Sequence, residues 1–507
     1  AAPLAGGRPL AADPMDAGGS APARSSTSAD GGAGGNSSVL ENRLRYLFVL
    51  IALTVLQYGI LAPVVQFLLL SFFAKDHGGG DCEEHPKSGP CRQAASDLAL
   101  VQGILGGIAQ CFACVLALLL GSWSDRLGRR PLLLTKVIFS VVPVLAVALH
   151  VFKGLTLWVF LLIVPAYEAF DVNGVFLGYV SDAVPDPRQR TQAFSSLMIV
   201  YILSGGPAVI LGGWLSPQSA ITVVMAITAF KVIFVAALLP ETADRAGGRP
   251  LAVLATARAA AEMIFFRNSF ISRMAVVFIL SGQSLVGLFT VAKPYLTGYL
   301  GVDKPTGARL AFVCGISVLV TVGLGLKPLL ARLGEVRAMQ VCLSFAAVLP
   351  LTYCACSEVW HIFVLAVVFT GPMVLQFPII TAIKSNLVNE EEQGLMQGAL
   401  ASFRVLAEAV AGAFFGALYS YCTDGGRAKD RTKAFPPLVL VSFLAACALL
   451  VACTLPERPP LPVPKSSTES FEALAGGGPR YSTMEEGGAR GPQSPGGPQD
   501  SGNPQDS

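Results

Sequence analysis

Long apolar stretches alternate with short polar segments along most of the chain, and Gly, Pro and charged residues bound each stretch. A helix needs about 20 mainly apolar residues to cross the hydrocarbon core of a bilayer. The pattern therefore predicts about twelve membrane-spanning helices. We expect them at 46–73, 98–122, 132–152, 156–183, 192–214, 218–239, 272–299, 308–327, 338–356, 360–386, 394–421 and 434–455.

The composition supports this interpretation, because 53% of the residues are hydrophobic and only 14% are charged. An ordinary soluble domain has about 25% charged residues. We therefore predict an all-α, multi-pass integral membrane protein whose surroundings are the lipid bilayer. Nothing in the composition indicates a nucleic-acid partner, and we expect a monomer without a cofactor or a bound metal.

The longest internal polar segment, 241–271, separates two sets of six predicted helices. We interpret it as a cytoplasmic linker between an N-terminal six-helix bundle at 46–240 and a C-terminal six-helix bundle at 272–456. Residues 1–45 and 457–507 are rich in Gly, Pro and Ser, which is typical of disordered tails. Lys and Arg gather in the loops on one side of the membrane, and this predicts that both tails are cytoplasmic.

The most specific motif lies between the second and third predicted spans, and it runs from Gly121 through Ser124-Asp125-Arg126-Leu127-Gly128-Arg129-Arg130 to Pro131. It resembles the loop signature of the major facilitator superfamily at every defining position. The resemblance implies a transporter fold of two six-helix bundles that rock around a central cavity. It also implies a conformational-switch loop that latches the two halves on the cytoplasmic side, formed by Gly121, Asp125, Arg126, Gly128, Arg129 and Arg130.

Two further resemblances narrow the family. The segment 392–398, Arg404, Arg190-Thr191 and Pro240-Glu241-Thr242 together resemble the branch that holds bacterial tetracycline exporters and hippocampus-abundant-transcript-like proteins. A glycine motif in the fifth span is similar to the antiporter signature of proton-coupled exporters, although its spacing differs. Plain helix packing explains the motif equally well, because small residues are common where membrane helices meet. Its residues are Gly206, Pro207, Gly212 and Gly213.

Ionisable residues inside predicted spans are candidates for proton coupling or substrate contact, because charge is costly in a bilayer. Glu168 and Asp171 have the i, i+3 spacing that puts two side chains on one helix face. Arg404 and Glu408 have i, i+4 spacing, so they form either a structural ion pair or a functional one. Lys231 and Lys293 lie nearer the ends of their spans, and we expect them to reach toward the membrane interface.

The remaining candidates are polar residues within spans and two cysteines outside them. The candidates for lining a cavity are Gln57, Gln66, Tyr167, Gln283 and Gln376, although glutamines also hold helices together. Cys82 and Cys91 lie in a predicted outer loop, where a disulfide is the favoured interpretation in an oxidising compartment. Free thiols and a metal site with the neighbouring acidic and histidine residues are the alternatives.

The sequence therefore predicts a protein that is not an enzyme. It has no phosphate-cradling or zinc-protease motif and only four histidines. We predict a secondary active transporter that moves a small organic solute by alternating access, with protons as the coupling ion and antiport as one mode. The alternatives are a gradient-driven facilitator or importer of a sugar, organic acid or vitamin-like solute, and a membrane receptor or trafficking adaptor. The plasma membrane and an endosomal or lysosomal membrane are both open.

Overall fold

A computed structural model describes residues 33–184, 187–241, 269–386 and 390–456, and these contain helices and no strand. The first half comprises α1 (Ala33–Asp76), α2 (Gly89–Leu127), α3 (Arg129–Phe139), α4 (Val141–Lys153), α5 (Trp158–Ala169), α6 (Asn173–Ala183), α7 (Pro187–Trp214) and α8 (Pro217–Leu238). The second half comprises α10 (Ser269–Tyr295), η1 (Leu296–Leu300), α11 (Lys304–Val320), η2 (Thr321–Gly325), α12 (Leu326–Ala355), α13 (Val359–Leu365), η3 (Ala366–Thr370), α14 (Gly371–Asn386), α15 (Glu390–Cys422), η4 (Arg431–Ala434) and α16 (Phe435–Cys453).

The described helices account for the expected spans. Nine of those in the described ranges are long and apolar enough to cross a membrane, and the bent pair α5 and α6 makes a tenth. The stretch Lys304–Ala355 is counted once, yet its 52 residues are enough for two spans. Its helix is interrupted at Gly334, whose φ is 74°. α7 adds the shorter apolar helix Ile199–Trp214, so the prediction of about twelve spans holds.

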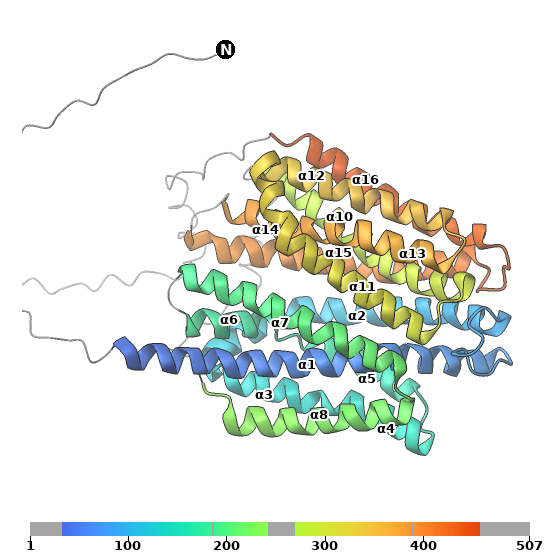
Figure 1. The fold of residues 1–507 in the computed structure, drawn as a ribbon, viewed down its shortest axis with the longest axis horizontal. Coiled ribbons are helices and arrows are strands. Elements are labelled where there is room, and N and C mark those ends of the chain that lie inside the picture. The colour runs from blue at the N-terminus through green and yellow to red at the C-terminus, as the bar shows by residue number, and fades with distance from the viewer. Residues whose placement is uncertain (1–32, 185–186, 242–268, 387–389, 457–507) are drawn as a thin grey trace, which may run out of the picture.

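The helices form two bundles, α1–α8 and α10–α16, which lie one above the other in Figure 1. Each bundle has its own buried core, with Leu69 and Val224 in the first and Met339 and Ile380 in the second. α1 begins and α16 ends at the same end of the molecule. We call this end inner, after the charge distribution in the sequence, and the opposite end outer.

The two bundles repeat one backbone feature, which supports a duplicated design. Gly128 ends α2 with φ 99° and ψ 163°, and Gly334 interrupts α12 with φ 74° and ψ 173°. Both glycines follow an Arg-Leu pair between two consecutive spans of their half. Positive φ is accessible to glycine at little cost. The short sequence repeat around these two glycines therefore corresponds to the same turn.

Close packing within the first bundle depends on Gly212 of α7. A methyl group added at Gly212 would meet the backbone of Ile60 and would come within 2.8 Å of Cγ of Pro63, both in α1. Membrane helices approach this closely where small residues remove side-chain bulk. The glycine motif of the fifth span therefore has a packing partner within its own bundle.

The packing at Gly212 can be tested by adding one methyl group. We expect Gly212→Ala to lower the melting temperature of the purified protein, because overpacking a dense site typically costs about 1–3 kcal/mol. Gly315→Ala in α11 is the matched control, since nothing lies within 4 Å of the added methyl there. Equal melting temperatures for the two variants would contradict the close contact between α7 and α1.

Candidate functional site

A cavity of about 240 Å³ lies between the two halves. Residues of α1 and α2 line it from the first half, and residues of α10 and α15 line it from the second. Its polar wall combines side-chain amides, two hydroxyls, an ammonium group and a carboxylate, from Gln66, Gln102, Gln110, Thr290, Thr297, Lys293 and Glu408. A cavity between two bundles with a few polar groups in an otherwise apolar wall is typical of small-molecule sites.

Of the glutamines and the tyrosine proposed from the sequence, Gln66 lines this cavity, whereas the others do not. Gln57 and Gln376 are only 2% and 1% exposed, and their Oε1 atoms have no hydrogen-bond partner among the described residues. Gln283 is half-buried and Tyr167 is buried. Sequence alone shows that a glutamine lies in a span, but the rotation of each helix decides which glutamines meet at the cavity.

Arg404 and Glu408 of α15 form an ion pair, as their i, i+4 spacing allows. The guanidinium of Arg404 also lies over two aromatic rings, with its Cζ 5.0 Å from the centroid of Phe278 and 4.6 Å from that of Phe377. Aromatic faces attract such a cation. Arg404 is thus held within the second half, and the carboxylate that Glu408 brings to the cavity already has a cationic partner.

Glu168 and Asp171 do not share one helix face, because the fourth span breaks between them. α5 ends at Ala169, α6 begins at Asn173, and the two helices are bent by 40°. Asp171 lies in the break, where its Oδ1 accepts a hydrogen bond of 3.0 Å from the backbone N–H of Asn173. The expected i, i+3 pairing is therefore wrong, and Asp171 supports the start of α6. Glu168 is exposed and interacts electrostatically with Lys136 and Lys293.

Lys136 of α3 is a cation of this region that the sequence did not single out. Its Nζ donates to the carbonyl of Tyr167 at 2.6 Å and lies 3.5 Å from the centre of the Tyr167 ring. The hydroxyls of Tyr58 and Tyr167 are hydrogen-bonded to each other. These contacts tie α1, α3 and α5 together beside Glu168.

Two other lysines, which we expected to reach toward the membrane interface, lie in the interior instead. Lys231 of α8 is 1% exposed and is among the most deeply buried large side chains described. Lys293 of α10 lines the cavity between the halves. The position of Lys293 near the end of its span suggested that it lies at the interface. The orientation of α10 places it instead at the contact with the other bundle.

The predicted switch loop is organised by a carboxylate that follows α8. Glu241 accepts hydrogen bonds from the backbone N–H groups of Arg129 and Arg130, at 2.8 and 3.1 Å, where α3 begins. A carboxylate is favourable at this positive end of the helix dipole. Arg129 also pairs with Asp182 of α6 at 3.0 Å. Gly121 and Asp125 lie in the last part of α2, where the Asp125 side chain is not among the described ones, and Arg126 is exposed.

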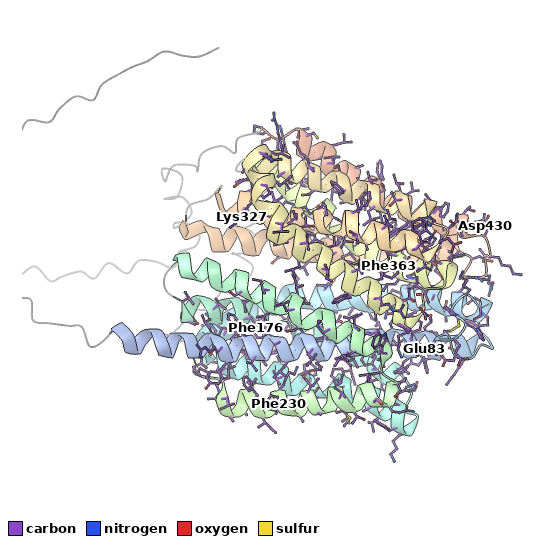
Figure 2. All side chains as sticks on the ribbon, in the orientation of Figure 1. Glu83, Phe176, Phe230, Lys327, Phe363 and Asp430 are labelled. Atoms are coloured by element: carbon purple, nitrogen blue, oxygen red, sulfur yellow. A yellow bond between two sulfur atoms is a disulfide. The ribbon has the colours of Figure 1, made fainter. Side chains whose placement is uncertain are left out.

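At the outer end, an ion pair joins the two halves. Cys82, in the loop between α1 and α2, forms a disulfide with Cys91 in the first turn of α2. Glu83 of this loop meets Nζ of Lys304, at the start of α11, at 2.8 Å. Lys304 is 2% exposed and also donates to the carbonyl of Leu215 at 3.1 Å. Figure 2 shows Glu83 at the end of the molecule opposite Lys327.

A seam of small residues closes the outer parts of α2 and α15 against each other. Methyl groups added at Gly103 and Gly107 of α2 would meet the backbone of Gly412 and Ala409, respectively. One added at Gly416 would come within 2.6 Å of the Ala99 carbonyl. We call these contacts the α2–α15 seam. A second crossing joins α7 to α11, where Gly206 faces Phe312 and Gly213 faces Ala308.

The comparison with protein families agrees with this geometry. The family model described as Major Facilitator Superfamily matches residues 47–412 and 326–484. The chain belongs to the Major Facilitator Superfamily. This confirms the family expected from the loop signature, and it points to an integral, multi-pass transporter rather than an enzyme.

Related proteins support the narrower resemblance. Hippocampus abundant transcript 1 protein of Homo sapiens is 21% identical over 397 residues, which cover 73% of this chain and 79% of the relative. Proton-coupled folate transporter of Rattus norvegicus is 28% identical over 357 residues, or 66% of this chain and 74% of the relative.

Solved structures share the fold at low sequence identity. The human organic anion transporter MFSD10 (TETRAN) superposes with a TM-score of 0.58 at 18% identity, covering 82% of this chain and 99% of that chain. The nucleoside transporter NupG gives a TM-score of 0.56 at 14% identity, with 81% and 99% covered. These similarities support the two-bundle architecture, and they do not identify a substrate for this chain.

Two adjacent glycines test the α2–α15 seam. Gly107 faces the backbone of α15, whereas nothing lies within 4 Å of a methyl added at Gly106. We expect Gly107→Ala to open the outer end and Gly106→Ala to leave it closed. The readout is labelling of a Thr290→Cys reporter in the cavity by an outside-applied, membrane-impermeant maleimide, in a background without reactive native cysteines. Equal labelling of the two variants would contradict the seam as the outer closure.

Proposed function

We propose that this protein is a secondary active transporter that moves a small organic solute by alternating access, with protons as the coupling ion. The observation that carries the proposal is the polar cavity between two separately packed halves, whose wall includes the close contacts of the α2–α15 seam. A solute held between two bundles changes its access when the bundles rock against each other. In this proposal the structure represents a state that is closed on the outer side.

The outer contacts suit an interface that opens and closes. The α2–α15 seam relies on small residues rather than on interlocking bulky side chains, so it can part without repacking either core. The Glu83–Lys304 pair adds one polar contact between the halves. At the inner end, Arg129 and Glu241 hold the switch loop within the first half. We propose that this loop, with Asp125, latches the halves when the inner side closes.

Glu168 is the favoured proton carrier of the two acidic candidates in the fourth span. It is exposed and interacts electrostatically with Lys136 from its own half and Lys293 from the other half. Asp171 is engaged by the backbone at the start of α6. A carboxylate that faces cations of both halves can change its interactions when the halves move. The names of the proton-coupled folate transporter and the organic anion transporter among the similar proteins support this class of function.

The glycine motif of α7 favours a packing role over a dedicated antiport signature. Gly212 packs on α1 within its half, while Gly206 and Gly213 pack on α11 of the other half. These contacts explain the small residues without invoking a coupling role. We therefore propose proton coupling without assigning the direction in which the proton moves relative to the solute.

Flux in proteoliposomes tests the coupling. We expect uptake from a mixed metabolite and drug panel to depend on an imposed pH gradient, and Glu168→Gln to lose most of this gradient-driven flux. Asp171→Asn is the matched control, because an amide oxygen can still accept the hydrogen bond from Asn173. We expect it to retain gradient-driven flux.

The other outcomes separate the alternatives. Flux that is indifferent to the pH gradient would support a facilitator and would remove the proton from the proposal. Absence of flux across the whole panel would favour a receptor or trafficking adaptor. Retained gradient dependence in Glu168→Gln would show that another group carries the proton.

A further inference from the structure

Lys293 differs in its partners from three other cations of the membrane region. Arg404 is paired with Glu408 and lies over two aromatic rings, Lys136 donates to the Tyr167 carbonyl, and Lys304 pairs with Glu83. In the described part of the chain, no hydrogen bond or ion pair involves the ammonium group of Lys293. Its side chain is nevertheless exposed and lines the cavity.

The carboxylates near this lysine do not take up its hydrogen bonds. Glu408 shares the cavity wall, but Arg404 already pairs with its carboxylate. Glu168 interacts with Lys293 electrostatically, yet the two form no ion pair among the described residues, and Glu168 does not line the cavity. The ammonium group of Lys293 therefore brings three hydrogen-bond donors to the cavity, and neither of these two carboxylates accepts a hydrogen bond from it.

The rest of the wall offers hydrogen bonds rather than charge. The amides of Gln66, Gln102 and Gln110 each have donors and an acceptor. The hydroxyl of Thr290 donates to the Val286 carbonyl at 2.8 Å, so its oxygen faces the site as an acceptor only. A solute with one negative charge and further hydrogen-bonding groups fits this set of partners.

The size of the cavity limits the solute. At about 240 Å³ it lies below the range of about 300–1,000 Å³ that is typical of sites for drug-sized ligands. A compact solute fills such a space, and a single lysine matches a monoanion better than a phosphate dianion, which usually takes a planar arginine fork or several donors.

We propose that the cavity binds a small organic monocarboxylate, with Lys293 as the residue that binds the carboxylate and the three glutamines as partners for hydroxyl or amide groups of the solute. This inference rests on the proposed transport function, since it names the substrate class of the same cavity. A carboxylate that binds there would join α10 of the second half to the amides of α1 and α2 in the first half.

Binding to the purified full-length protein in lipid nanodiscs tests the proposal without requiring transport. The probes are matched carboxylic acids and carboxamides of nearly equal shape, from lactate and lactamide to 4-hydroxybenzoate and 4-hydroxybenzamide, with phenyl phosphate as the dianion. We expect at least one acid to bind about tenfold or more tightly than its amide, because hydrogen bonds to charged groups are the stronger ones. Phenyl phosphate is expected to bind no better than the amides.

Variants of two lysines show whether Lys293 is the residue responsible. Lys293→Gln should abolish the preference for the acid over the amide, and Lys293→Arg should retain it, provided that both variants match the wild type in gel filtration. Lys327→Gln is the control, because this exposed lysine lies at the inner end, away from the cavity. We expect it to keep the wild-type preference.

Several results would overturn the proposal. These are equal binding of every acid and its amide, no binding of any acid, tighter binding of the phosphate, or an unchanged preference in Lys293→Gln. The two proposals also fail separately. Acid binding without flux would refute transport and leave the carboxylate site, whereas flux of neutral solutes without acid binding would refute the carboxylate site and leave transport.

Discussion

Helices inside a bilayer gain little by hiding apolar side chains from one another, because the surrounding lipid tails are equally apolar. Close backbone approach must come from residues that lack bulk, and this constraint governs the contact between the two halves. Gly103 and Gly107 on α2 meet Gly412 and Ala409 on α15 along such a seam. The neighbouring Gly106 lies one position off the seam, and it lines the cavity together with these three glycines of the seam. One helix therefore supplies both the closure and a wall of the site.

The charged groups of the membrane region fall into two kinds by their partners. The pair of Arg404 with Glu408 and the contact of Lys136 with Tyr167 satisfy their charges locally and fix helices in place. Lys293 and Glu168 are exposed, interact electrostatically and come from opposite halves. Charge in a bilayer is costly unless it is paired or hydrated. Lys293 and Glu168 are therefore the charged groups whose interactions can change when a solute or a proton binds.

The two halves share a turn but have diverged in their details. Gly128 and Gly334 adopt the same positive-φ backbone between consecutive spans. In the first half this turn starts α3, whose N-terminus binds the carboxylate of Glu241. In the second half, the described spans contain the π-helical segments η1, η2 and η3, and the Ser317 hydroxyl donates to the Val367 carbonyl at 2.9 Å, linking α11 to η3. Wide helical turns of this kind are frequent at functional sites.

The spans, the family and the pairing of Arg404 with Glu408 were predictable from the sequence, because apolar length, a contiguous loop motif and i, i+4 spacing are local properties. Which polar residues line the cavity was predictable only in part, as for Gln66 and Glu408, since it depends on how each helix is rotated and where it bends. The break at 170–172 interrupts the helix between Glu168 and α6. Asp171 was a signal for it, because Asp side chains often accept a hydrogen bond from the backbone two residues further on. The sequence predicted an interfacial position for both Lys293 and Lys231. Only the packing of α10 against the other half distinguished them, because it places Lys293 at the cavity. The bilayer imposes the same apolar requirement on every span, so it does not distinguish one polar residue from another. Tertiary structure decided which polar residues meet, because the packing of each helix against its particular neighbours sets which side chains face the cavity.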